Sequence, residues 1–188
     1  MSDDCLHDVV RAHLESFFAG HAVEYFTWED GPIMTELPDF HVARFAPGPK
    51  SELWTYVSVG CGVTKHAEAA RLEFVLMCPY ETPRAVELLA IFAHRHISDP
   101  LGAWHLMPVG EPWLDDSTCD VFFISLPYPF GPDLEICNLA DDHIHILWLL
   151  PITQSEREYC KKHGAEAMES RFEESGLEFW KLDRDSVV

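Results

Sequence analysis

The run from Ile146 to Glu158 constrains the fold of this chain more than any other stretch. Its first five residues are apolar, which predicts a buried strand, and Pro151 should end that strand because it has no N–H for a ladder bond. Thr153 followed by Glu156 is the T-x-x-E pattern of a capping box, so a helix should begin there. The run contains no nucleophile, phosphate loop or metal-ligand cluster. It therefore predicts an architectural joint and lowers the expectation of an enzyme.

Apolar spacing divides the rest of the chain into helices and strands in mixed order. Helical spacing over 6–18 predicts a first helix, and Thr82 followed by Pro83 predicts the start of a second, which 98–100 should end. A last helical region should cover 154–175, with Gly164 either breaking it or tolerated inside it at a cost of about 1 kcal/mol. Strands are predicted over 23–28, 40–45, 53–59, 70–77, 121–126, 134–139, 143–149 and 177–182, and a loop over 100–117. This order predicts one α+β domain over residues 1–188, with helices packed on a mixed, largely antiparallel sheet.

The charge balance limits the classes of partner. The chain has 32 acidic and 13 basic side chains, for a net charge of −19. Such a surface repels phosphate backbones, which argues against nucleic acid. The same field would speed capture of a basic partner, or would serve solubility alone.

Membrane and secretion signals are missing from the sequence. No apolar run approaches the about 18 residues of a membrane-spanning helix, and the N-terminus lacks the basic and apolar regions of a signal peptide. The six cysteines are widely spaced, which predicts reduced thiols. We therefore expect a cytoplasmic protein that does not bind membranes.

Two patterns suggest chemistry, and each has a simpler explanation. His143 and His145 should share one face of a strand beside Asp141 and Asp142, which supplies metal-ligand types without H-E-x-x-H or C-x-x-C spacing. Scattered histidines are therefore favoured, and a metal-dependent hydrolase is the alternative. The run from Gly60 to Gly62 could hold a nucleophilic cysteine, but a glycine-rich turn is the simpler expectation. We predict no catalytic residue, no metal site and no cofactor.

Loop aromatics and acidic clusters are the candidates for contact with a partner. Aromatic side chains in turns are often interface anchors, although they are slightly more often pinned to the core. Acidic clusters would meet a basic partner if they converged on one face, and a dispersed solvated surface is the alternative. The predicted partner-binding residues are Trp113, Asp115, Asp116, Tyr128, Asp141 and Asp142.

Several segments, in order along the chain, resemble the suppressor of fused (SUFU) domain family. They are the run from Leu147 to Glu158, the run from His163 to Gly176, Asp183 to Val188, Leu53 to Gly60, Trp113-Leu114 and Leu126 to Pro129. The resemblance implies a protein-binding domain without enzymatic activity. It also implies either an immunity protein that masks a toxin, as in short bacterial members, or a scaffold that sequesters a transcription factor, as in animal members. The length of the chain favours the bacterial type, and its charge favours a basic toxin.

Overall fold

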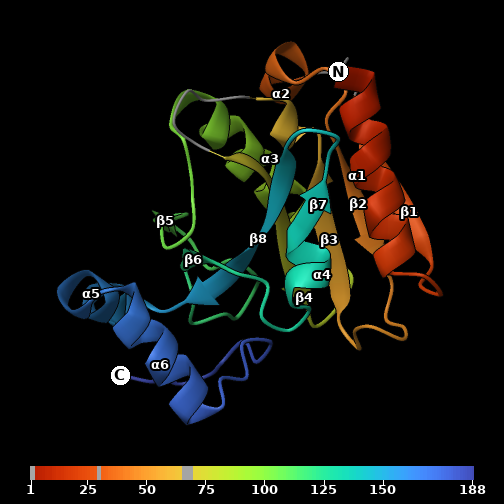
Figure 1. Cartoon of the computed structure of the whole chain (residues 1–188). Helices are drawn as coiled ribbons and strands as arrows, with labels where there is room; N and C mark the ends of the chain where they lie inside the picture. The colour runs from red at the N-terminus through yellow and green to blue at the C-terminus, as the bar shows by residue number, and fades with distance from the viewer. Residues whose placement is uncertain (1–2, 29–30, 65–69) are drawn as a thin grey trace. The chain divides into compact units, whose positions relative to one another are not determined.

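The computed structural model describes residues 3–28, 31–64 and 70–188, and its contacts divide into two compact units (Figure 1). The first unit comprises Met1–Ala103 and Leu126–Trp148, and the second comprises Trp104–Ser125 and Leu149–Val188. One strand, β8 (His143–Ile152), begins in the first unit and ends in the second. The single domain predicted over 1–188 stays a prediction.

The first unit is a sheet with helices on its faces. Its helices are α1 (Asp3–Phe17), α2 (Pro32–Glu36), α3 (Pro83–Ser98) and α4 (Pro132–Glu135), with a 3₁₀ turn η1 (Cys61–Val63). Its strands are β1 (Val23–Thr27), β2 (His41–Phe45), β3 (Trp54–Val59), β4 (Arg71–Cys78), β7 (Ile136–Asn138) and the greater part of β8. Strands β1 to β4 form an antiparallel meander, β4 pairs parallel with β8, and β7 pairs antiparallel with β8.

Helices α1 and α3 cover opposite faces of this sheet (Figure 1). Phe18, just after α1, stacks on Phe45 of β2 with the ring centroids 4.4 Å apart. On the other face Phe92 of α3 meets Phe74 of β4 at 5.8 Å. The antiparallel registers put Phe45 on the face of Met77, so alternation along β4 turns Phe74 to the opposite side. Both faces of β4 are therefore buried, as its continuous apolar run predicts.

The second unit contains a hairpin and two helices. Strand β5 (Leu106–Pro108) pairs antiparallel with β6 (Val121–Ser125), and α5 (Gln154–His163) packs on β6 and on α6 (Ala165–Ser175). Gly164 separates the two helices with φ = 91°, a left-handed value that glycine adopts without steric cost. Of the two expectations for Gly164, the break is therefore confirmed.

The predicted fold class is confirmed: the chain is α+β, with a mixed, largely antiparallel sheet. Local details differ at five places. Pro151 does not end its strand, because β8 continues through it to Ile152. Strand β5 and helix α2 were not predicted, the strand predicted over 134–139 is α4 followed by β7, and 177–182 forms turns. Pro132, at the first position of α4, has the fixed φ that suits a helix start, which explains why the segment begins helically. Among the described residues no helix combines the length and the apolar character needed to cross a bilayer.

Candidate partner-binding site

Three predicted contact residues share one turn of the second unit. Trp113 is 1% exposed and lies edge-to-face on Phe122, with the ring centroids 6.0 Å apart. The backbone N–H of Trp113 donates to the backbone carbonyl of Cys119, which closes the loop. Asp115 and Asp116 follow at the exposed tip. Trp113 therefore belongs to the core in this structure, where it holds a tip that presents two carboxylates to solvent.

The other three predicted contact residues lie in turns of the first unit. Tyr128 is 59% exposed, in the proline-rich turn after Leu126. Asp141 and Asp142 are exposed between β7 and β8. The Asp142 carboxylate is already engaged, because it accepts the N–H of His143 at 2.9 Å and lies 3.4 Å from Arg71 Nε. The partner-binding role of all six residues stays a prediction.

His143 and His145 do lie together on β8, as predicted. Their Nε2 atoms are 2.9 Å apart, and His145 Nδ1 lies 3.3 Å from Glu135 Oε1. Within the described ranges no group of three or more His, Cys, Asp and Glu side chains is arranged to hold a metal ion. The described residues therefore do not supply the three-ligand metal centre that a metal-dependent hydrolase would need.

The glycine-rich turn from Gly60 to Gly62 surrounds a buried carboxylate. Glu73 of β4 is 1% exposed and accepts backbone N–H groups of Gly60 at 2.8 Å, Gly62 at 2.9 Å and Cys61 at 3.3 Å. The Ser58 hydroxyl donates to the same carboxylate. Gly60 has φ = 112°, and a Cβ there would lie 2.6 Å from His7 Nε2, so the turn requires glycine at this position.

The electrostatics of this turn oppose a reactive thiol. Burial raises the pKa of the Cys61 thiol well above its usual value, and the charge of Glu73 raises it further. A nucleophilic cysteine needs the opposite shift. Burial also raises the pKa of Glu73 to about 7, against hydrogen bonds from Ser58 and the backbone that lower it. These pKa shifts and the positive φ of Gly60 agree with the glycine-rich turn that the sequence favours over a nucleophilic cysteine.

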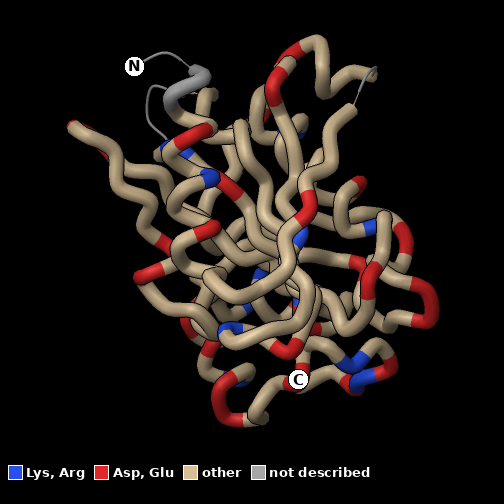
Figure 2. Tube along the Cα trace, turned by 90° about the vertical axis from the view of Figure 1, so that its right-hand side faces the viewer, with Lys and Arg blue, Asp and Glu red and all other residues tan. Residues whose placement is uncertain are grey.

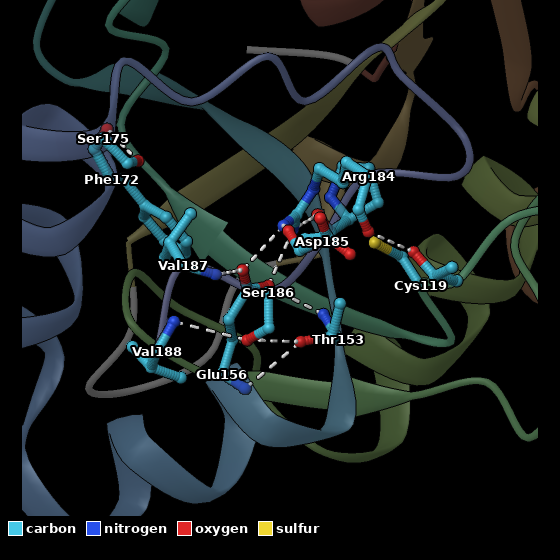
Figure 3. A network of polar contacts seen from close by, with 12 residues as sticks. Cys119, Thr153, Glu156, Phe172, Ser175, Arg184, Asp185, Ser186, Val187 and Val188 are labelled. Atoms are coloured by element: carbon cyan, nitrogen blue, oxygen red, sulfur yellow. Dashed lines mark hydrogen bonds and ion pairs between the residues drawn. The ribbon is translucent and has the colours of Figure 1, made fainter.

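The joint predicted at Thr153 is a buried polar network in the second unit (Figure 3). The Thr153 hydroxyl accepts the N–H of Glu156, and the Glu156 carboxylate accepts the N–H of Thr153 at 2.8 Å, which completes the capping box. Both Glu156 oxygens also bind Arg184, at 2.6 and 2.7 Å. Arg184 donates to the carbonyl of Pro151 as well, and Val187 donates its N–H to Glu156.

This network connects the segment 147–158 to the segment 183–188, two of the C-terminal segments that carry the family resemblance. Glu156 is 0% exposed and Arg184 is 8% exposed, so the pair lies in the interior. Although burial lowers the pKa of Arg184, its hydrogen bonds and ion pair with Glu156 outweigh that effect and raise the pKa above the usual value. The cap was predictable from T-x-x-E spacing. The ion pair was not, because 28 residues separate its members.

The charged surface is acidic because acidic side chains outnumber basic ones, 32 to 13, and most described basic side chains already lie beside an acid of the same chain. Figure 2 shows Asp and Glu at many places along the trace and Lys and Arg at fewer. Within the described ranges, the basic residues that form ion pairs with Asp or Glu are Arg11, Arg44, Arg71, Arg84, Arg95, Arg157, Lys161, Arg171, Lys181 and Arg184. The excess of carboxylates therefore remains for solvent or for a partner.

Known proteins of one family match this chain. The family model described as Suppressor of fused protein (SUFU) matches residues 37–185. A solved SUFU homolog from Neisseria gonorrhoeae FA 1090 is 36% identical, covers 98% of each chain and has a TM-score of 0.87. A chain of the Sufu-Fu complex, 11% identical, has a TM-score of 0.75 with 97% of this chain and 91% of that chain covered.

Two further matches are more partial. Drosophila Suppressor of Fused is 10% identical with a TM-score of 0.61, over 94% of this chain and 50% of that chain. Immunity protein YqcF of Bacillus subtilis (strain 168) is 27% identical over 62 residues, which are 33% of this chain and 32% of that protein. The matched part thus spans about a third of the length of this curated relative. The family model and the Neisseria homolog together show that the chain belongs to the suppressor of fused (SUFU) family.

Proposed function

We propose that this chain is a non-enzymatic protein-binding domain, and that it acts as an immunity-type protein that masks a toxin. The observation that carries the proposal is the excess of acidic over basic side chains, 32 to 13, which leaves the chain with a net charge of −19 whichever ion pairs form. That arrangement favours a basic partner, whose encounter would be accelerated by complementary charge. The similarity to Immunity protein YqcF supports a toxin as that partner.

The mechanism would be occlusion by a complementary surface, with one chain bound per toxin. Exposed carboxylates such as Asp115 and Asp116 would raise the association rate, and an exposed aromatic such as Tyr128 would contribute apolar contact. We place this activity in the cytoplasm. The described cysteines support that location, since Cys61, Cys78, Cys119, Cys137 and Cys160 are all free and buried.

Capture of the partner tests the proposal. The tagged chain would be used to isolate bound proteins from its native cell, and each captured protein would be expressed with and without the chain. We expect a stoichiometric complex with a protein that stops growth when expressed alone and is tolerated when the chain is present. A stoichiometric complex with a transcription factor, without any toxicity to relieve, would instead support the scaffold role. The absence of both a complex and a rescue would contradict binding altogether.

A further inference from the structure

The paired histidines of β8 have a geometry that the proposed binding function does not use. His143 and His145 are two residues apart on one strand, so both rings lie on the same face. Their ring centroids are 4.6 Å apart, with an angle of 72° between the planes. His143 is exposed, and the side chain of His145 is 28% exposed. We propose that their two Nε2 atoms bind a divalent transition-metal ion of the Ni²⁺, Cu²⁺ and Zn²⁺ class.

The carboxylate of Glu135 prepares His145 for this role. Glu135 is the last residue of α4, its side chain is 17% exposed, and its Oε1 lies 3.3 Å from His145 Nδ1. With its proton on Nδ1, His145 would donate a hydrogen bond to this carboxylate and keep the lone pair on Nε2. Histidines that bind metals ordinarily donate their second ring N–H to a carboxylate or carbonyl, which fixes the tautomer and increases the basicity of the ligating nitrogen.

The spacing of the two nitrogens suits a metal with cis ligands. Bonds of about 2.0–2.1 Å from a metal to imidazole, at a right angle, place the two nitrogens about 2.9 Å apart. The observed separation of His143 Nε2 and His145 Nε2 is 2.9 Å. Tetragonal Cu²⁺ and Ni²⁺ have such right angles, whereas tetrahedral Zn²⁺ would require the rings to separate slightly. The site therefore favours Cu²⁺ and Ni²⁺ over Zn²⁺.

The chain supplies two direct ligands to this site, and water would complete the coordination. Asp142, the acid just before the strand, accepts the backbone N–H of His143 and forms an ion pair with Arg71. Among the residues that the structure describes, no third side chain joins the pair to form a three-ligand group. The competing explanation is a hydrogen bond, in which one Nε2–H donates to the other ring.

Calorimetric titration of the untagged chain with Ni²⁺ and with Zn²⁺, at one fixed pH for all variants, distinguishes these explanations. We expect one ion per chain, with Ni²⁺ bound more tightly than Zn²⁺. His143→Ala should lower the Ni²⁺ affinity at least tenfold, and Glu135→Ala should lower it about tenfold through the loss of the carboxylate. His163→Ala is the matched control, because His163 is an exposed histidine on α5 in the other unit and should leave the affinity unchanged.

The result that would overturn the proposal is no Ni²⁺ binding, or an equal loss in His143→Ala and His163→Ala. An unchanged affinity in Glu135→Ala would contradict the part assigned to the carboxylate. Paramagnetic resonance of the Cu²⁺-loaded chain gives an independent readout, and should show coupling to two nitrogens that falls to one in His143→Ala. These measurements use the chain alone, so their outcome is separate from that of the partner capture.

Discussion

Among single residues, Glu156 and Arg184 allow a direct test of how much a buried ion pair contributes to the stability of the fold. Replacing Arg184 with Met leaves the carboxylate of Glu156 buried and without its cation. Breaking a buried ion pair from one side typically costs about 3–5 kcal/mol. We expect Arg184→Met to lower the free energy of unfolding by about 3–5 kcal/mol. Urea denaturation monitored by circular dichroism measures this change.

The control for Arg184→Met is the exposed pair of Lys181 and Glu178, whose charged atoms are 2.5 Å apart. Lys181→Met should cost less than about 1 kcal/mol, because exposed ion pairs contribute little. Adding Glu156→Gln to Arg184→Met removes the unpaired charge and should recover part of the loss. Equal costs for Arg184→Met and Lys181→Met would contradict the assignment of Glu156 and Arg184 as a buried stabilising pair.

Glu73 predicts a pH dependence of stability. Burial raises its folded pKa to about 7, above the ordinary value of 4.5, so the folded state binds more protons than the unfolded state between these values. The contribution of Glu73 to stability is then fully present below about pH 4.5 and is lost as the pH rises through 7. The loss is on the order of 3 kcal/mol for a shift of this size.

Glu73→Gln isolates that contribution, because glutamine does not titrate. The free energy of unfolding of the unaltered chain minus that of Glu73→Gln should fall as the pH increases from 4.5 to 7. Urea denaturation at several pH values measures this difference. A difference that rises with pH would show that the N–H groups of Gly60 and Gly62, rather than burial, decide the pKa.

At the scale of elements, the predictable features are those that depend on local chemistry. Thr82 and Thr153 were predicted as N-caps and both accept an N–H from the first turn of their helices, since capping involves residues only two or three apart. The burial of Trp113 and the enclosure of Glu73 depend on segments distant in sequence, and no local pattern reports them. The same reason explains why Glu135 was not expected beside His145.

The capping box of α5 can be tested by two substitutions at one position. Thr153→Ala removes the hydroxyl that accepts the N–H of Glu156, and should lower the free energy of unfolding by about 1 kcal/mol. Thr153→Ser keeps an equivalent acceptor and should retain most of the stability. Thermal and urea unfolding of the two variants would measure this. Equal destabilisation by Ala and Ser would indicate that packing of the threonine methyl group, rather than the cap, is responsible.

At the scale of the whole molecule, the acidity has two separable consequences for a partner. A net charge of −19 acts at long range on any basic protein, whereas specific carboxylates act only where the partner touches them. The sequence predicted the first consequence from composition alone. It could not predict the contact face, because which acids share a surface is decided by folding.

Two double variants with the same change in net charge separate these consequences. Asp115→Asn with Asp116→Asn, and Glu173→Gln with Glu174→Gln, each remove two exposed negative charges. Asparagine suits position 116, where φ is 63°.

With a captured partner, both double variants should slow association at low salt through the weaker long-range field, and the effect should shrink as salt is added. If the tip at Asp115 and Asp116 touches the partner, its variant should associate roughly threefold or more slowly than the helix variant. Stopped-flow rates at several salt concentrations measure both effects. Equal association rates for the two variants would show that the tip at Asp115 and Asp116 does not touch the partner. Association rates that do not depend on salt would show that the charge does not guide binding.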